Sequence, residues 1–552
     1  MKKQGFLYGS AVLIISALAV KVLGALFKIP LANMLGGTGM GYFSAAYGLF
    51  MPIYAVSVTG LPSAVARAVS ARTAEGNAED AHAVRSTALK LFGGVGAAAS
   101  VIMLIGAYPF CRFGSGDIRA LPAVMAISPC IAAGCLVSVY RGYYEGMRNM
   151  YPTAVSQIAE GIAKLVFGLM FCSMTIVLSN RRPDIFVMIT GCGSAEDICA
   201  DTVIPYAAAA AVLGITLSSA AGLVYMIWQS RNEKHSFGIT AEKRRAVERE
   251  LLRTAVPASV GALVTNLTSL IDLVTIMSSL RILVKKSPWL FSEFLGNGIS
   301  YGQIPNFIYG SFTGLAVTLF NLVPSVTNMF GKSMLPAAAA AKAAGDRKAL
   351  GRCAFGAVLA SAVLSVPAGL GMSVMSEEIL SLLFSGQTAE IAVCIQPLKV
   401  LGLAVPFLCI SSAAFAVLQA ADKADIPVKL MAVGAAVKLI GNLILTPLPF
   451  MGVSGAAVST LLCYIIICAA SLYCLKKYAF MQSGEMCSAL VRIIMSGILC
   501  GICAAAVSEI MGNEAQLFVK MLFSCGSGCV IYIISTYFSG IFNKSTLKMP
   551  IS

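Results

Sequence analysis

Long apolar stretches follow one another along this chain from its first residues to its last, and they decide what it can fold into. Hydrophobic residues make up 58% of the 552 residues, and charged residues only 12%. About 20 apolar residues are enough for a helix to cross a bilayer, where a helix satisfies its own backbone hydrogen bonds. The sequence therefore predicts an all-α polytopic membrane protein and excludes a soluble domain.

Fourteen of these stretches are predicted to be transmembrane helices. They cover residues 6–33, 41–69, 86–110, 120–140, 152–179, 203–229, 254–280, 304–330, 353–372, 391–419, 427–446, 452–474, 487–508 and 517–541. With both termini in the cytoplasm, the loops on that side carry most of the Lys and Arg, including the run from Lys243 to Arg249. This asymmetry follows the positive-inside rule, so the net charge of +15 is mainly a topology signal.

Matching segments occur in the two halves of the chain. The segment from Glu145 to Pro152 leads to Lys164, and the segment from Gln419 to Pro427 leads to Lys438 with the same spacing from its first residue. A second echo joins Leu61-Pro62-Ser63-Ala64 with Val323-Pro324-Ser325-Val326. These echoes predict an internal duplication of six spans per copy.

Because six is an even number, both copies would run parallel, related by a pseudo-two-fold axis along the membrane normal. The predicted domains are an N-lobe of spans 1–6 (residues 1–230), a basic cytoplasmic linker (231–253), a C-lobe of spans 7–12 (254–480) and a helix pair of spans 13–14 (481–552). Two lobes that face each other would enclose a cavity suited to alternating access.

Basic side chains lie inside several apolar stretches in which acidic ones are rare. A charge at bilayer depth costs roughly 2.5–3.5 kcal/mol on insertion scales, so several charges of one sign indicate an anionic ligand in an internal cavity. The candidate substrate-binding residues are Lys21, Lys28, Arg67, Lys399 and Lys438. Lys21 and Lys28 lie two turns apart on one helix face. The alternative for each residue is snorkelling to the interface, pairing with an acid or packing at a helix end.

Acidic residues inside the spans need partners if they are ionised. Asp272, deep in the seventh span, is predicted to balance a cavity lysine or to bind a coupling cation. Glu160 and Lys164 are four residues apart, a spacing that favours a structural ion pair over direct contact with a ligand. Arg141 precedes a short inner loop, where a positive charge is by default a topology signal.

The sequence predicts no catalytic residue, no metal site and no cofactor. Most of the 17 cysteines are scattered inside spans, and the chain has only 2 histidines. Cys500 and Cys503 form a CxxC without a second pair or a histidine beside it in the sequence, which makes zinc improbable. Cys192 and Cys199 share an outer loop, and whether they form a disulfide is left open. We expect a transporter and not an enzyme, because an enzyme would show an acidic or histidine cluster. Transport would be driven by protons, sodium or the membrane potential.

The segment from Tyr140 to Lys164 contains Arg141-Gly142-Tyr143-Tyr144-Glu145-Gly146 and, further on, the run from Pro152 to Gln157 with Glu160. These motifs resemble the stage V sporulation protein B branch of the polysaccharide transporter family, and this segment is the most specific part of the resemblance. The resemblance extends to Lys21–Gly24 and Lys28–Ala32 near the start of the chain, to Leu270–Asp272, and to Leu418-Gln419 up to Pro427. The positions that match the family motifs are Arg141, Gly142, Gly146, Pro152, Gln157, Gln419 and Pro427.

That family belongs to the multidrug/oligosaccharidyl-lipid/polysaccharide exporter superfamily, which also contains the lipid II flippases. The resemblance implies a flippase in the bacterial cytoplasmic membrane that moves an undecaprenyl-pyrophosphate-linked peptidoglycan precursor or polysaccharide unit, with a role in spore cortex or cell wall synthesis. The expected partners are the lipid-linked oligosaccharide, membrane lipids and cell-wall synthases, and no nucleic acid. The alternative is a cation-coupled multidrug exporter of the same superfamily, which would favour an acidic cavity.

Overall fold

The structure is a computed structural model that describes residues 6–191, 200–231, 241–292, 294, 299–512 and 516–541. Cys192 and Cys199, the two cysteines of the outer loop, lie outside these residues. The described residues are almost entirely helical and contain no strand. Thirteen helical segments within them are long and apolar enough to cross a membrane. The predicted all-α polytopic class is confirmed.

The predicted number of fourteen spans is one more than the thirteen segments found, and the difference lies near the start of the chain. Helix α1 (Phe6–Val58) runs through the predicted turn between the first two spans, and its only non-helical residue is Gly36, with φ 63° and ψ −175°. Glycine tolerates this left-handed φ because it has no Cβ. The segment Ile15–Ala74 is counted as one of the thirteen, but its 60 residues are more than two span lengths, enough for both predicted spans.

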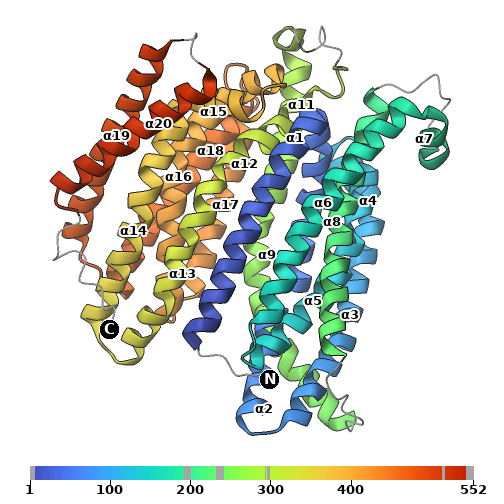
Figure 1. Ribbon diagram of the computed structural model, residues 1–552, viewed down its shortest axis with the longest axis vertical. Helices are drawn as coiled ribbons and strands as arrows, with labels where there is room; N and C mark the ends of the chain where they lie inside the picture. Colours follow the sequence, from blue (N-terminus) through green and yellow to red (C-terminus); the bar gives the residue numbers. More distant parts are fainter. Residues whose placement is uncertain are drawn as a thin grey trace. The chain divides into compact units, whose positions relative to one another are not determined.

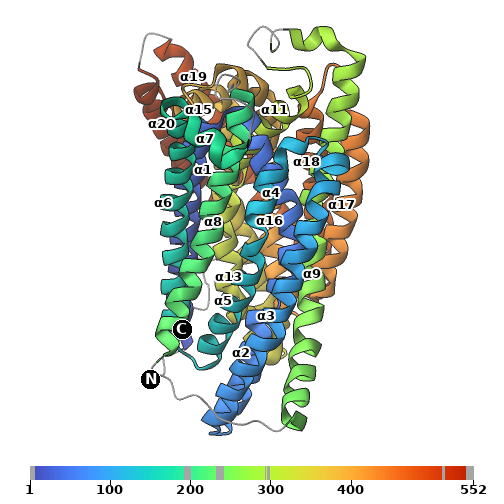
Figure 2. The same ribbon diagram turned by 90° about the vertical axis from the view of Figure 1, so that its right-hand side faces the viewer.

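The chain divides into two compact units, Met1–Ser278 and Ser279–Ser552. The helices of the first unit are α1, α2 (Leu61–Ala74), α3 (Ala78–Pro109), α4 (Leu121–Ile127), α5 (Pro129–Gly146), α6 (Tyr151–Arg181), α7 (Pro183–Thr190), α8 (Ala200–Ser230) and most of α9 (Ala241–Lys286). Short π and 3-10 turns at Phe110–Ser115 and Ile118–Ala120 join α3 to α4. Within this unit α6 packs against α8 and α1, and α5 packs against α2 and α3 (Figures 1 and 2).

The second unit begins inside α9. Its helices are α11 (Ile304–Ser311), α12 (Val317–Phe320), α13 (Leu322–Ala343), α14 (Arg347–Val374), α15 (Ser376–Leu383), α16 (Thr388–Ala420), α17 (Asp425–Leu445), α18 (Val453–Tyr478), α19 (Ser483–Met511) and α20 (Leu517–Phe538). A 3-10 turn at Pro288–Phe291 precedes them, and a π turn at Phe312–Ala316 joins α11 to α12. Helix α16 contacts α13, α14 and α18, while α19 and α20 pack against each other and α19 packs against α14. The predicted boundaries of lobes, linker and helix pair stay predictions.

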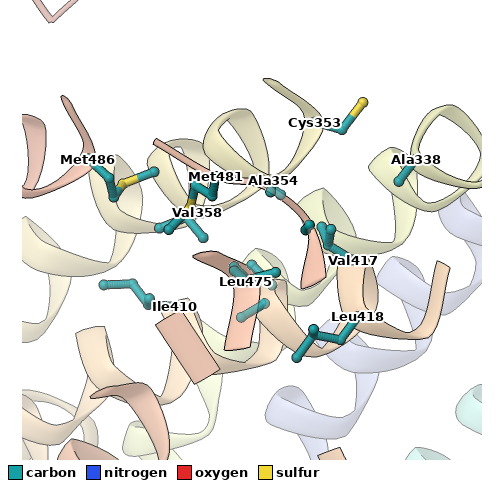
Figure 3. Close-up of a cluster of buried hydrophobic side chains, with 14 of the residues drawn as sticks. Ala338, Cys353, Ala354, Val358, Ile410, Val417, Leu418, Leu475, Met481 and Met486 are labelled. Carbon is teal, nitrogen blue, oxygen red and sulfur yellow. The ribbon is translucent and has the colours of Figure 1, made fainter. Parts of the chain in front are cut away.

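Small side chains fill much of the core of the second unit (Figure 3). Ala354 and Val358 of α14 are fully buried beside Ala414 and Val417 of α16, and Leu475 of α18 closes the cluster. Small residues let helix backbones approach closely, which matters in a membrane because lipid is as apolar as the core itself. The core is therefore held mainly by close packing of α14, α16 and α18.

The two echoed segments share one local backbone feature, while the internal duplication itself stays a prediction. Arg148 and Asp422 have positive φ values of 57° and 61°, although neither is glycine. The amide of the next residue bonds back to the helix in both places, from Asn149 to Tyr144 over 2.9 Å and from Lys423 to Leu418 over 3.0 Å. This six-to-one bond after a left-handed residue is the Schellman motif. The two echoed segments therefore fold into the same helix end.

Candidate functional site

Two of the basic residues inside the spans lie close together in the first unit. Lys28 of α1 and Lys164 of α6 are both half-buried. Nζ of Lys164 lies 4.9 Å from the ring centre of Phe27, the residue before Lys28, so the two lysines belong to the same region of the unit. Lys28 is one of the predicted substrate-binding residues, whereas Lys164 was assigned a structural ion pair. The structure thus adds a second cation to the predicted anion site.

Aromatic rings support the ammonium group of Lys164. Its Nζ donates a hydrogen bond to the hydroxyl of Tyr47 over 3.3 Å. The same atom lies 4.9 Å from the ring centre of Phe27 and 5.7 Å from that of Tyr47. These distances are typical of cation–π attraction, which holds a positive charge without neutralising it. Lys164 makes no ion pair among the described residues, so its ammonium group can interact with an anion.

The supporting rings belong to a ladder along the second half of α1. Ring centres are 4.8 Å apart for Phe43 and Tyr47, 5.9 Å for Tyr47 and Phe50, and 5.0 Å for Phe50 and Tyr54. Phe43 and Phe50 are almost fully buried, while the two tyrosines are half-buried. The ladder fixes the position of Tyr47 and therefore of Lys164.

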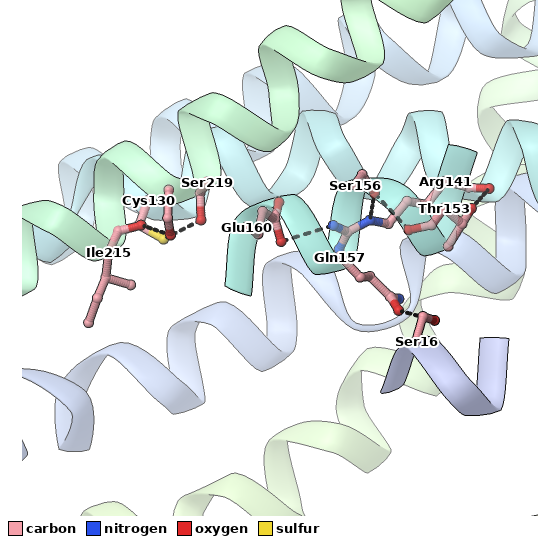
Figure 4. A network of polar contacts seen from close by, with 10 residues as sticks. Ser16, Cys130, Arg141, Thr153, Ser156, Gln157, Glu160, Ile215 and Ser219 are labelled. Carbon is pink, nitrogen blue, oxygen red and sulfur yellow. Dashed lines mark hydrogen bonds and ion pairs between the residues drawn. The ribbon is translucent and has the colours of Figure 1, made fainter. Parts of the chain in front are cut away.

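The predicted ion pair between Glu160 and Lys164 is wrong. Glu160 pairs with Arg141 of α5, whose Nη2 lies 2.9 Å from Oε2 of the carboxylate (Figure 4). Arg141 Nε also donates to the hydroxyl of Ser156 over 2.9 Å. Spacing along one helix places Glu160 and Lys164 near each other, but the guanidinium of Arg141 on the neighbouring helix lies at ion-pair distance from the carboxylate of Glu160. Lys164 turns instead toward Tyr47.

Further polar contacts continue this network on both sides (Figure 4). Ser16 of α1 donates to Oε1 of Gln157 on α6 over 3.2 Å. Cys130 of α5 lies 3.2 Å from the hydroxyl of Ser219 on α8. Polar groups of α1, α5, α6 and α8 therefore contact one another inside the unit, which lowers the cost of burying them in a membrane protein.

The glycines of the family motif explain why Arg141 stands where it does. A Cβ on Gly142 would lie 2.6 Å from the carbonyl oxygen of Pro62, and a Cβ on Gly146 would lie 2.7 Å from Cβ of Val69. The spacing of small residues four apart lets α5 approach the backbone of α2. Arg141 directly precedes Gly142, so the close packing of α5 against α2 fixes the position of Arg141 in the unit.

The remaining motif positions lie at helix ends. Pro152 is in the first turn of α6, where a proline fits because its missing N–H has no helical partner there. Gln419 is exposed near the end of α16, and Pro427 is buried in the first turn of α17. These residues belong to the turns of the two echoed segments, one in each unit.

The other predicted site residues lie on separate helices. Lys21 on α1 and Arg67 on α2 are exposed, whereas Lys399 on α16 and Lys438 on α17 are half-buried. Asp272, predicted to balance a lysine or to bind a cation, is half-buried on α9. Lys399 and Lys438 belong to the second unit, and the roles of all five residues stay predictions.

A group of cysteines in the second unit was missed at the sequence level. Cys500 and Cys503 of α19 are predicted to lack a second pair, but α20, which carries Cys525 and Cys529, packs against α19 so closely that a Cβ on Gly528 would lie 3.2 Å from the sulfur of Cys500. The signal in the sequence was the i, i+4 spacing of the two cysteines on α20. No group of three or more metal-ligating side chains in metal geometry occurs among the described residues.

The arrangement around Lys28 and Lys164 can bind an anion. Glu160 pairs with Arg141, and uncharged aromatic groups hold the ammonium group of Lys164 in the same region as Lys28. Like charges held together in an apolar region raise the local positive potential, and an anion placed between them relieves their repulsion. Phosphate oxygens are suitable partners for lysine ammonium groups.

Comparison with known families gives two overlapping matches. Residues 171–525 match the family model described as lipid II flippase MurJ, and residues 6–179 match the model described as polysaccharide biosynthesis protein. Stage V sporulation protein B of Bacillus subtilis (strain 168) is 21% identical over 99% of this chain and 98% of its own length. Lipid II flippase MurJ of the same organism is 22% identical over 98% of this chain and 96% of its own length.

Solved structures show the same fold. A structure of lipid II flippase MurJ in an inward closed conformation has a TM-score of 0.68 at 14% identity and covers 95% of this chain and 98% of that one. An inward-facing multidrug resistance transporter of the MATE family has a TM-score of 0.58 at 13% identity and covers 84% of this chain and 98% of that one. At these identities the likeness concerns the fold alone.

Proposed function

The chain belongs to the lipid II flippase MurJ family, and on this premise we propose that it carries an anionic, lipid-linked glycan across the bacterial cytoplasmic membrane by alternating access. Membership of this family confirms the prediction of a transporter rather than an enzyme. The proposed cargo is an undecaprenyl-pyrophosphate-linked peptidoglycan precursor or polysaccharide unit. The similarity to stage V sporulation protein B supports a role in spore cortex synthesis, or more broadly in cell wall synthesis.

One observation carries the choice of an anionic cargo. The ammonium group of Lys164 is held by Tyr47 and Phe27 beside Lys28, inside spans that are otherwise apolar. A lysine kept there only for structure would be expected to meet a carboxylate, since an uncompensated charge at this depth is costly. Glu160, four residues before Lys164, instead forms an ion pair with Arg141.

In this proposal Lys28 and Lys164 bind the pyrophosphate. Lys21, Arg67, Lys399 and Lys438 would contact the cargo elsewhere along its path, with exposed Arg67 assisting near the cytoplasmic entrance. Asp272 would balance one of these charges or couple transport to a proton or sodium ion. Both termini would be cytoplasmic, and membrane lipids and cell-wall synthases would be partners.

A cation-coupled multidrug exporter is the second candidate, because MATE transporters share the fold. A cavity for cationic drugs would need available carboxylates. In the first unit Glu160 is bound by Arg141 at 2.9 Å, which removes it as a ligand for a drug or a coupling ion. The charge balance around Lys28 and Lys164 therefore favours the flippase.

Binding measurements on the purified protein test the proposal. An undecaprenyl-pyrophosphate-linked disaccharide should bind more tightly than its undecaprenyl-monophosphate analogue, and a lipophilic cationic drug should bind least. Lys28→Gln and Lys164→Gln should each weaken binding of the pyrophosphate compound about tenfold or more, the loss of one charge-assisted contact. Lys243→Gln, which removes an exposed charge far along the sequence, is the matched control.

Tighter binding of the drug than of the pyrophosphate compound would favour the exporter. Unchanged binding of the pyrophosphate compound in the Lys28→Gln/Lys164→Gln variant, at normal protein levels, would rule out these lysines as its ligands.

A further inference from the structure

A cavity of about 450 Å³ lies in the second unit, where α14 ends and where α19 and α20 meet α15. Figure 1 shows α15 beside α20. The lining includes Val374 and Glu378, Ser508 and Glu509 of α19, and Lys520 of α20. A volume of several hundred Å³ is typical of sites for small molecules. None of these residues belongs to the proposed pyrophosphate site.

Charged and polar groups inside the cavity are only partly satisfied by one another. The hydroxyl of Ser508 donates to Oε1 of Glu378 over 2.9 Å, and Nζ of Lys520 lies 3.8 Å from the same oxygen. The side chains of Lys520 and Glu378 are 13% and 21% exposed. A separation of 3.8 Å is too long for a hydrogen bond, so the ammonium group keeps its donors for another acceptor. Glu509 is exposed and makes no ion pair within the described part of the chain.

The signs of these charges define the class of ligand. Two carboxylates and one ammonium group repel a purely anionic molecule such as a pyrophosphate. A zwitterion fits, since its ammonium group can meet Glu509 and Glu378 while its phosphate meets Lys520. A metal ion fits poorly, because no group of three or more metal ligands occurs in the described residues.

The surroundings indicate that the zwitterion belongs to a lipid. The cavity lies where the span Gly484–Met511 ends and the span Leu517–Phe538 begins, which is the level of lipid headgroups. Ile510 is 85% exposed, Phe518 63% and Leu522 61%, so exposed apolar side chains lie on α19 and α20 close in sequence to the residues that line the cavity. Exposed apolar surface of this kind contacts acyl chains in a membrane protein.

We propose that this cavity binds the headgroup of a phospholipid with a primary amine. Glu509 and Glu378 accept hydrogen bonds from the lipid ammonium group, and Lys520 donates to the phosphate. The acyl chains lie along α19 and α20. A lipid held in this way ties the terminal helix pair to α14 and α15, and its binding is independent of the transported cargo.

Native mass spectrometry of the delipidated, full-length protein tests the proposal. Phosphatidylethanolamine and phosphatidylglycerol of the same acyl composition are added in equal amounts. The wild-type protein should retain phosphatidylethanolamine about fivefold more than phosphatidylglycerol, and Glu509→Gln should bring this ratio close to one. Glu509 makes no ion pair in the described residues, so this change should leave folding intact. Lys520→Gln should weaken binding of phosphatidylethanolamine.

Glu377→Gln is the matched control, since Glu377 is an exposed neighbour of Glu378 that does not line the cavity. Equal retention of both lipids by the wild type, or an unchanged ratio in Glu509→Gln, would overturn the proposal. Displacement of the lipid by an equal concentration of soluble glycerophosphoethanolamine would overturn the lipid as the source of the headgroup. Failure of any of these tests leaves the flippase proposal untouched, because no cargo is present.

Discussion

The ion pair between Arg141 and Glu160 should contribute measurably to the stability of the first unit. Its side chains are 15% and 23% exposed, so it lies between a surface pair and a fully buried one. Surface pairs contribute about 0–1 kcal/mol, whereas breaking a buried pair costs about 3–5 kcal/mol because one charge stays behind. Glu160→Gln leaves the Arg141 guanidinium without its counter-charge but keeps one acceptor for it. We therefore expect a loss of about 2 kcal/mol in the free energy of unfolding.

A double-mutant cycle in detergent, followed by denaturant unfolding, measures this interaction. Arg141→Gln alone should cost a similar amount, because it leaves the carboxylate of Glu160 unpaired. The double variant Arg141→Gln/Glu160→Gln removes both charges, so it should be more stable than the sum of the two losses predicts, by about 2 kcal/mol.

The chain offers a matched control for this cycle. Arg244 and Glu248 form an ion pair with the same separation of 2.9 Å, but their side chains are 48% and 28% exposed. Glu248→Gln should therefore cost no more than about 0.5 kcal/mol. Additive losses in the Arg141 and Glu160 cycle would refute the reasoning, since they would mean that burial does not strengthen the pair.

Three further predictions concern packing, backbone geometry and coupling. Gly142→Ala should lower the free energy of unfolding by about 2 kcal/mol, because the added Cβ would lie 2.6 Å from the carbonyl oxygen of Pro62. The control Gly94→Ala, whose Cβ would have no atom within 4 Å, should be neutral or slightly stabilising, and equal effects of the two changes in thermal unfolding would contradict this. Arg148 has a φ of 57°, which glycine adopts more easily than other residues, so Arg148→Gly should stabilise the protein by about 1 kcal/mol and Arg148→Val should destabilise it. A loss of stability in the glycine variant would contradict the argument that the backbone is strained at this residue. Asp272→Asn should keep the fold but change the dependence of transport on pH or sodium, and unchanged transport across these conditions would make Asp272 a structural residue.

Hydropathy was enough to predict the fold class and most of the spans, because a helix that crosses a membrane must be predominantly apolar over about 20 residues. The two echoed segments share a helix end with Arg148 and Asp422 in the left-handed conformation, and the duplication of six spans stays a prediction. The connection between the first two spans was harder to predict. Helix α1 continues on both sides of Gly36, and a single change of φ leaves no polar loop in the sequence.

The contacts within the candidate site were less predictable. Helical spacing placed Glu160 beside Lys164, but the choice between Lys164 and Arg141 depends on how α5 packs against α6. The basic residue Lys28 could be found from its unusual place in an apolar stretch. The proximity of Lys28 to Lys164 and the cavity around Glu378 and Lys520 both come from tertiary packing, which local sequence patterns do not predict.

Translocation in liposomes tests the central claim most directly. The purified protein is reconstituted with a fluorescent undecaprenyl-pyrophosphate-linked disaccharide pentapeptide, and the appearance of its headgroup on the opposite face is followed in time. We predict translocation well above that of empty liposomes, and a loss of about tenfold or more in the Lys28→Gln/Lys164→Gln variant at equal protein density. Translocation no faster than in empty liposomes, under proton and sodium gradients and a membrane potential of either sign, would contradict the account.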